Sequence, residues 1–143
     1  MVRKNGIEIV DFPKTDYEAL VDYEDWRVAV LAFCENTKPE KIQAMQKHLD
    51  TDEVFVLVRG KATLYTAGDG ENPGEIRALQ LEPYKVYNVK KGVWHNHVLD
   101  EEGMGVIVEN RDTCDANSPI RQLTEEQKSA ILSIDAGDCK RKG

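Results

Sequence analysis

The sequence has no apolar run that could cross a membrane, and it contains little histidine or cysteine. Its longest apolar stretch, residues 28–34, is far shorter than the roughly 20 residues that a transmembrane helix needs. No apolar block typical of a secretory signal peptide follows Met1. We therefore predict no membrane partner and a cytoplasmic location.

Basic residues are also in short supply. The 143 residues include 19 Lys and Arg against 26 Asp and Glu, and the formal net charge is -7. A protein that binds phosphate backbones usually presents a basic face, and the two basic clusters here, residues 90–91 and 140–142, are short. We therefore predict that nucleic acid is not a partner.

Cysteine is scarce and scattered. Cys34, Cys114 and Cys139 are odd in number, which is typical of reduced thiols and not of a disulfide framework. A disulfide is not needed for stability either, because a chain of this length buries roughly 68–70% of the surface that its unfolded form exposes. The sequence has no repeat, low-complexity tract or linker, so we predict a single domain over residues 1–143.

The sequence does contain many short strand patterns, separated by turns rich in Gly, Pro and Asp. They cover residues 7–12, 27–33, 54–58, 61–66, 77–81, 86–89, 94–99 and 104–109. Many short strands at close spacing are typical of a barrel or jelly roll. We therefore predict an all-β fold with short N-terminal strands and a core over roughly residues 27–110.

Two stretches are ambiguous. Residues 16–26 are acidic and aromatic, with no clear period. Residues 40–48 fit a helical stripe, and the alternative is a strand whose one face carries Ile42, Ala44, Gln46 and His48. We favour the strand, because residues 50–52 would turn it directly into the next strand and make a strand–turn–strand unit.

A single helix is expected near the end of the chain. Thr124 and Gln127 form a capping box, in which each residue's side chain bonds the other's backbone N–H. Apolar residues follow at helical spacing at positions 130, 131 and 134. The helix is predicted over residues 124–135, with Gly137 near its end.

All three histidines lie in two segments beside predicted strands. His48 and Glu53 precede the strand at 54–58, and His95 and His97 lie within the strand at 94–99. Side chains repeat every two residues along a strand, so His95 and His97 share a face. If the strands bring the two segments together, the fold has one polar pocket that holds most of its chemistry.

The spacing of these residues resembles the cupin family. His48, Glu53 and Gly60 are spaced like the second half of the first cupin motif, and Gly92 with His95 like the end of the second. The resemblance implies a cupin-type β-barrel of the RmlC-like kind. It also implies that His48, Glu53 and His95 hold a divalent metal at the mouth of the barrel.

The match to the two motifs is partial. Gln46 stands where the family has its first histidine, and Lys90 replaces a proline of the second motif. Gln46 is therefore a candidate fourth ligand. Two or three imidazoles with one carboxylate suit Zn, Fe, Mn or Ni better than Mg or Ca, so we expect a divalent transition metal as the cofactor.

Within the cupins, residues 92–99 are most similar to the ureidoglycolate lyase group, whose enzymes split ureidoglycolate into glyoxylate and urea. The resemblance implies a lyase that acts on a small polar carboxylate. His97 is the candidate base for the substrate hydroxyl, or alternatively a ligand in place of the missing histidine. The candidates to bind a substrate carboxylate are Arg27, Arg59 and Arg77.

Two other functions fit the same residues. The departures at Gln46 and Lys90 fit a non-catalytic module that binds a sugar or small acid without metal. A metal-free sugar epimerase or isomerase would need a His–carboxylate pair or a tyrosine, and the tyrosine candidates are Tyr65, Tyr84 and Tyr87. All three functions imply a small-molecule partner.

Homodimerisation is a further implication of the resemblance. It also has a physical reason, because a short barrel exposes strand edges that need to be covered. The N-terminal strand at residues 7–12 is the candidate for pairing across the interface.

Overall fold

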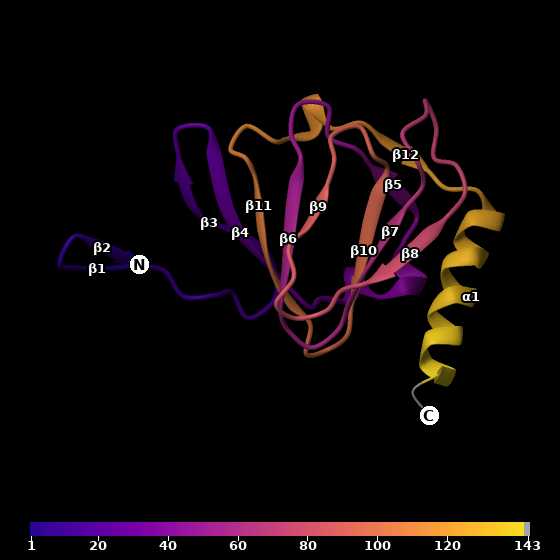
Figure 1. Ribbon diagram of the computed structural model, residues 1–143, viewed down its shortest axis with the longest axis horizontal. Helices are drawn as coiled ribbons and strands as arrows, with labels where there is room; N and C mark the ends of the chain where they lie inside the picture. The colour runs from indigo at the N-terminus through magenta and orange to yellow at the C-terminus, as the bar shows by residue number, and fades with distance from the viewer. Residues whose placement is uncertain (142–143) are drawn as a thin grey trace.

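The computed structural model describes residues 1–141, with side chains up to residue 137. Cys139, for which a reduced thiol was predicted, lies outside the described side chains. Two five-stranded sheets pack against each other (Figure 1). The first contains, in spatial order, β3 (Asp16–Tyr23), β4 (Trp26–Ala32), β11 (Met104–Asn110), β6 (Glu53–Arg59) and β9 (Tyr87–Val89). The second contains β12 (Ile120–Gln122), β5 (Ala44–Gln46), β10 (His95–Leu99), β7 (Ala62–Thr66) and β8 (Arg77–Gln80).

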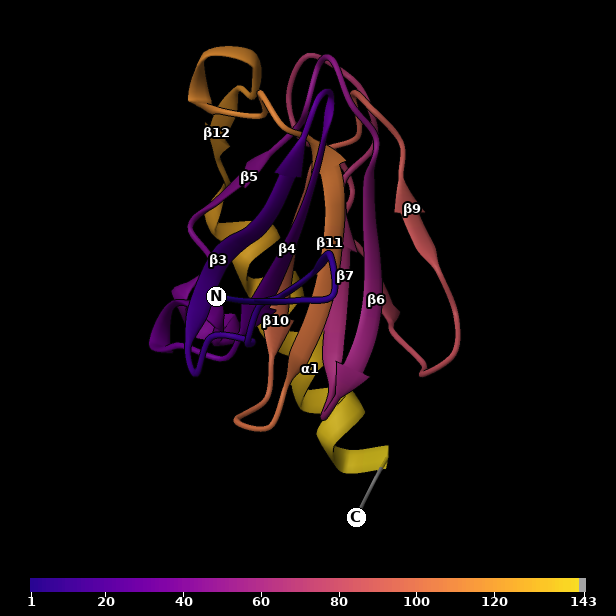
Figure 2. The ribbon, with the colours of Figure 1, turned by 90° about the vertical axis from the view of Figure 1, so that its left-hand side faces the viewer.

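The chain crosses repeatedly from one sheet to the other. From β4 to β7, each strand lies in the opposite sheet to the strand before it, as in a jelly roll. Figure 2 shows the first sheet face on, with β3 at one edge and β9 at the other. All strand pairs are antiparallel. The predicted all-β fold, with short N-terminal strands and one C-terminal helix, is confirmed.

The strand predicted in residues 40–48 is present but shorter, and its neighbours differ from the prediction. Residues 39–41 form a 3-10 turn, η2 (Pro39–Lys41), and only β5 is extended. Ile42 therefore leaves the predicted face and packs with Met45 beneath the helix. The predicted strand–turn–strand unit is wrong as a hairpin, because β5 and β6 belong to different sheets. The segment between them crosses the sandwich and carries His48.

β3 lies in the stretch where no period was evident. It is an edge strand with most of its side chains exposed, so both of its faces accept polar residues. The pairing of β3 with β4 also shifts register between Ala19 and Val21. Such a bulge moves the following side chains to the other face, which hides the alternation in the sequence.

The helix α1 (Glu125–Arg141) packs on the outer side of the second sheet (Figure 1). Its predicted capping box is confirmed: the Thr124 N–H donates to Oε1 of Gln127 (2.8 Å), and the Gln127 N–H donates to Oγ1 of Thr124 (3.1 Å). The helix continues beyond Gly137, so this glycine does not end it. A glycine inside a helix costs only about 1 kcal/mol relative to alanine, which the packing of Ile131 outweighs.

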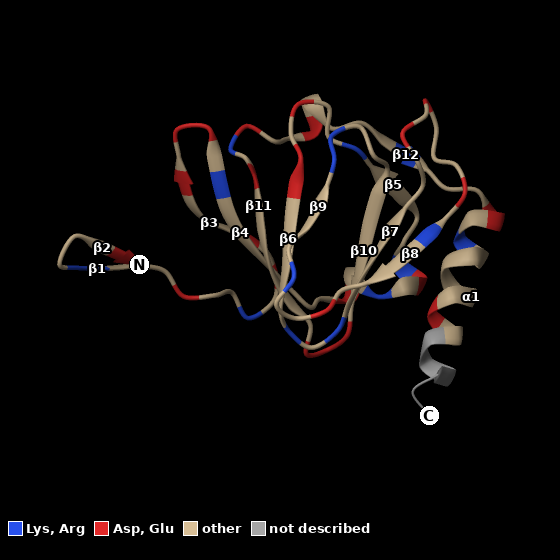
Figure 3. Ribbon diagram, viewed as in Figure 1, with Lys and Arg blue, Asp and Glu red and all other residues tan. Residues whose placement is uncertain are grey.

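Two apolar clusters hold the layers together. One fills the space between the sheets and includes Leu31, Phe55 and Ile107. The other joins the second sheet to α1 and includes Trp94 and Ile131. Lys and Arg are scattered over several elements (Figure 3). Among the residues that the structure describes, no helix is both long and apolar enough to cross a membrane.

Candidate metal centre and catalytic pocket

A cavity of about 520 Å³ opens between the two sheets and is lined by both of them. The predicted site residues meet there, although they come from distant parts of the chain. Those that line the cavity are Gln46, His48, Glu53, His95 and His97. The fold thus brings the two histidine segments together, as the sequence predicted.

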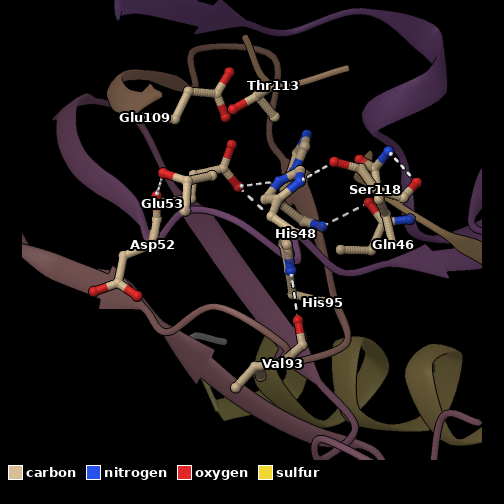
Figure 4. Close-up of polar contacts among 12 residues, drawn as sticks. Gln46, His48, Asp52, Glu53, Val93, His95, Glu109, Thr113 and Ser118 are labelled. Carbon is tan, nitrogen blue, oxygen red and sulfur yellow. Dashed lines mark hydrogen bonds and ion pairs between the residues drawn. The ribbon is translucent and has the colours of Figure 1, made fainter. Parts of the chain in front are cut away.

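His48, Glu53 and His95 form the centre of the cavity (Figure 4). Their ligand atoms all lie within 4.8 Å of one another, and all three side chains are buried. Oε1 of Glu53 is 2.9 Å from Nε2 of His95 and 3.5 Å from Nε2 of His48. A carboxylate oxygen and two imidazole nitrogens therefore converge on one point.

A backbone hydrogen bond holds the two histidine segments in register. The Gly92 N–H donates to the carbonyl oxygen of His48 at 2.7 Å. Gly92 has φ +82°, a conformation that glycine adopts without steric cost. The turn before β10 thus brings His95 to the crossing segment that carries His48.

Each imidazole is fixed in the tautomer that presents Nε2 to the centre. Nδ1 of His95 lies 2.9 Å from the Val93 carbonyl, which can only accept, so Nδ1 carries the proton. Nδ1 of His48 lies 2.7 Å from Oγ of Ser118. That hydroxyl donates its own proton to Oδ1 of Asn117 at 3.1 Å, so it accepts from His48. Both rings are therefore oriented as metal-ligating histidines usually are.

The electrostatics of the cluster favour an ionised carboxylate. Burial opposes the charge on Glu53, but hydrogen bonds with His48 and His95 hold its pKa well below the ordinary value. Burial likewise opposes a charged His95, yet the hydrogen bond to Glu53 raises the pKa of this imidazole. His95 and Glu53 thus form an ion pair when a proton occupies Nε2, and a cation that binds the cluster would displace that proton.

His97 lies on the same face of β10 as His95 and also lines the cavity. Burial lowers its pKa to about 4, so the ring is neutral at physiological pH. Phe55 packs against it, with ring centroids 6.1 Å apart. His97 is therefore a neutral imidazole beside the cluster.

Gln46 pairs directly with His95 across β5 and β10 and is half-buried. Its Nε2 donates to the carbonyl oxygen of Ser118 at 3.3 Å. Because a carbonyl cannot donate, the amide nitrogen must face it, which leaves Oε1 as the atom available to a ligand.

Glu109 and Tyr17 also line the cavity, and neither was assigned a role from the sequence. Glu109 on β11 is buried, and the Tyr17 hydroxyl from β3 donates to its Oε1 at 2.9 Å. Burial and the neighbouring carboxylate of Glu53 raise the pKa of Glu109. Figure 4 shows Glu109 close to Glu53. A signal for it existed: Glu109 lies two residues after Ile107, which faces the core.

The tyrosines named from the sequence lie elsewhere. Tyr65 is buried in the cluster beneath the helix, and Tyr84 is fully exposed. The hydroxyl of Tyr87 accepts a hydrogen bond from the backbone of Glu82. Within the described residues none of these three lines the cavity, and the tyrosine that does is Tyr17.

The three arginines proposed to bind a substrate carboxylate lie in different places. Arg27 lines the cavity and donates from Nε to Asp22 at 2.8 Å. Arg59 and Arg77 lie on the surface. Of the three, Arg27 is therefore the one placed to meet a bound molecule.

Comparison with known proteins rests on structure alone, because no family model and no curated protein sequence matches the chain. A cupin-2 domain protein from Shewanella frigidimarina is 20% identical, with 67% of this chain and 80% of that one covered and a TM-score of 0.50. Pac13 of Streptomyces, in a variant with uridine, gives 11% identity, 80% and 85% coverage and a TM-score of 0.55. The fold is a cupin fold.

A 3,4-ketoisomerase, QdtA from Thermoanaerobacterium thermosaccharolyticum, supports the same assignment. Its double mutant in complex with TDP is 14% identical, with 69% of this chain and 68% of that one covered and a TM-score of 0.54. Similarity at this level establishes the cupin fold and leaves the reaction open.

The cupin fold accounts for Gly60 in the motif. This residue has φ +69°, and a Cβ added to it would lie 2.4 Å from the carbonyl carbon of Glu102. Only glycine fits at this turn, which leads from β6 into β7. His48, Glu53 and Gly60 are thus spaced by the crossing segment and the full length of β6.

Proposed function

We propose that this cupin is a metal-dependent enzyme that cleaves a small polar carboxylate, with ureidoglycolate as the first substrate to test. The observation that carries the proposal is the convergence of His48, Glu53 and His95 within 4.8 Å, with both imidazoles presenting Nε2. This donor set suits Zn, Fe, Mn or Ni. His48, Glu53 and His95 would hold the ion, and Oε1 of Gln46 is a candidate fourth donor.

A bound metal of this kind would act as a Lewis acid that stabilises negative charge on a substrate oxygen. The protein's own residues would carry out the proton transfers. Neutral His97 accepts the proton of the substrate hydroxyl, and the electron pair of that bond forms the new carbonyl. The carbon–nitrogen bond breaks, and the leaving nitrogen takes a proton from Glu109 on the facing sheet. The products are glyoxylate and urea.

Arg27 and Tyr17 would position the substrate. Asp22 binds Nε and Nη2 of Arg27, at 2.8 and 3.4 Å, and Tyr17 is a further polar neighbour of this guanidinium. The remaining N–H groups of Arg27 would donate to a substrate carboxylate. Tyr17 holds Glu109 through its hydroxyl. The selectivity for an acid would therefore come from β3 and β4, at the open edge of the first sheet.

A second function is favoured by one specific contact, the 2.9 Å hydrogen bond between Nε2 of His95 and Glu53. A His–carboxylate pair with Tyr17 nearby can move protons without a metal, as a sugar isomerase or epimerase requires. QdtA and WlaRA, which have the same fold, are named as ketoisomerases. Pac13 is named as a nucleoside dehydratase.

The deciding experiment is metal analysis of the purified protein together with an assay for urea release. We expect about one transition-metal ion per chain, and loss of both metal and turnover in His95→Ala. His97→Ala should keep the metal and lose turnover, because its role is proton transfer. Tyr84→Ala, a change at a fully exposed side chain, is the matched control and should keep both.

Other outcomes select other functions. Metal-free protein that converts a ketosugar would support the isomerase. Metal-free protein that only melts at higher temperature with a sugar or small acid would support a binding module. Unchanged metal content in His95→Ala would refute the ligand assignment.

A further inference from the structure

The cavity between the sheets extends well beyond the metal cluster. Arg27 and Leu31 both line it and lie four residues apart on β4, which is about 14 Å of strand. Arg27 pairs with Glu109, which lies close to Glu53, so this end of β4 is at the metal cluster (Figure 4). Asp16 also lines the cavity and pairs with the last residue of β4. The cavity therefore runs along β4 from the metal cluster to a far end at Asp16.

The second sheet borders the same far end. The 3-10 turn η1 (Glu35–Thr37) begins three residues after the end of β4 and packs against β10, the strand that begins at His95. Asn36 and Thr37 of this turn, together with Cys34 before it, line the cavity. The far end is therefore built by the start of β3 and by η1, whereas β6 and β10 supply Glu53 and His95 at the metal cluster.

The cavity is too large for ureidoglycolate alone. Its volume of about 520 Å³ lies within the range of roughly 300–1,000 Å³ that is typical of sites for drug-sized ligands. The main chain of ureidoglycolate is as long as about two residues of extended peptide, roughly 7 Å. A molecule that reaches from the metal cluster to the far end would therefore be about twice as long.

The middle of the cavity is apolar. Phe55 and Ile107 pair across β6 and β11, each two residues beyond the carboxylate of its strand, Glu53 or Glu109. Both belong to the core cluster between the sheets, and so does Leu31 on β4. All three apolar side chains line the cavity. A molecule that crosses this part of the cavity therefore meets hydrocarbon on the first sheet.

The two ends of the cavity differ in charge. Among the described residues that line it, Arg27 is the only Lys or Arg, and it lies at the metal end. At the far end, Oδ1 of Asp16 accepts the N–H of Tyr17 at 2.8 Å, which leaves Oδ2 for a ligand. Asp16 has φ +69°, a conformation that non-glycine residues seldom adopt and that is concentrated at functional sites. The far end is thus suited to a hydrogen-bond donor and unsuited to an anion.

We propose that the substrate is an elongated acid with three parts. Its carboxylate binds Arg27, its apolar middle packs on Phe55 and Ile107, and a hydroxyl or amino group at its far end donates to Asp16. The proposal rests on the proposed function in one respect, the carboxylate at Arg27, and it names a longer class of acids for the same site. A second anionic group, such as a phosphate or another carboxylate, is disfavoured because it would meet the carboxylate of Asp16.

Unreactive acids of equal length test the far end. 8-Aminooctanoate, 8-hydroxyoctanoate, octanoate and octanedioate share a chain that spans roughly 10 Å, and they differ in the group at its end. Calorimetric titration of the purified protein measures their dissociation constants. We expect the amino and hydroxy acids to bind about tenfold or more tighter than octanedioate, and 8-aminooctanoate to exceed 4-aminobutanoate by a similar factor. The ratio between the amino and hydroxy acids identifies the preferred donor.

Asp16→Asn keeps the shape of the side chain and its Oδ1 acceptor but removes the charge. We expect it to weaken the binding of 8-aminooctanoate by about tenfold, to strengthen that of octanedioate and to leave that of octanoate unchanged. Asp69→Asn, at an exposed carboxylate outside the cavity, is the matched control and should bind every probe like the wild type. Arg27→Gln should weaken the binding of every probe by about tenfold.

The outcomes separate this proposal from the proposed function. Equal affinities for the amino, hydroxy and dicarboxylate probes would overturn the assignment of the far end, and so would an unchanged preference in Asp16→Asn. In either case the Arg27→Gln variant still reports whether the carboxylate is bound at Arg27. A protein that binds none of the probes but releases urea from ureidoglycolate would overturn the elongated substrate and leave the proposed function standing.

Discussion

Replacing Ser118 with alanine tests whether the hydrogen bonds behind His48 prepare it as a metal ligand. The Ser118 side chain is 1% exposed, and its hydroxyl is the acceptor for Nδ1 of His48 at 2.7 Å. Alanine would leave that buried N–H without a partner. Such a loss costs about 1–3 kcal/mol. The loss of the serine hydroxyl would affect Asn117 less, because Oδ1 of Asn117 still accepts a hydrogen bond from the N–H of Cys114 at 3.0 Å.

The same substitution should weaken metal binding. Without the serine, His48 can protonate on Nε2, and that tautomer cannot ligate a metal at the centre. Loss of a group that orients a metal-ligating histidine typically reduces affinity by about 10–100-fold. We therefore expect a lower free energy of unfolding for the metal-free protein, together with a dissociation constant raised within that range.

Urea unfolding of the metal-free protein and calorimetric titration with Zn²⁺ measure the two effects separately. Ser133→Ala, an exposed serine on α1, is the matched control and should change the free energy of unfolding by less than about 0.5 kcal/mol. If Ser118→Ala lowered stability but left the zinc affinity unchanged, His48 would not depend on this hydrogen bond as a ligand.

Two further predictions concern the turns around the site. Gly60→Ala should destabilise the fold by several kcal/mol in urea unfolding, since its Cβ would meet the Glu102 backbone at 2.4 Å, whereas Gly68→Ala, with φ +73° and open space, should cost about 1 kcal/mol. Equal losses would show that the close approach at Gly60 is relieved. The second prediction concerns the pH dependence of stability. Hydrogen bonds from Lys90, from the backbone N–H of Lys91 and from the Asn88 amide lower the pKa of Asp52 to about 2. The unfolded value is about 3.9, so this stabilisation is complete above that value and is lost as the pH falls towards 2. In Asp52→Asn, the melting temperature should therefore fall less steeply as the pH is lowered from about 4 to about 2. If the melting temperature of this variant fell as steeply as that of the wild type, the assignment to Asp52 would be refuted.

The sequence identified much of the fold because many of its signals are local. The capping box of Thr124 and Gln127 depends on residues three apart, and the structure contains both of its hydrogen bonds. The alternation that puts His95 and His97 on one face needs only five residues of strand. Where a bulge or a turn interrupted the regular alternation of side chains, the sequence did not predict the strand correctly. The bulge hid β3, and the turn before β5 moved Ile42 to another core.

The site divides in the same way. His48, Glu53 and His95 could be named from the sequence because each lies in a short motif with a fixed spacing. The glycines of those motifs, Gly60 and Gly92, both have a positive φ, which favours glycine. The roles of Tyr17, Glu109 and Ser118 could not be predicted, because they arise from contacts that span 92 residues, between Tyr17 and Glu109, and 70 residues, between His48 and Ser118. Such contacts depend on which strands become neighbours. The sequence by itself therefore determined the ligand candidates and the strand periodicity. The tertiary structure alone decided which groups orient the imidazoles and which carboxyl group faces them. The physical reason is that residues brought together by long-range strand pairing have no characteristic spacing in the sequence.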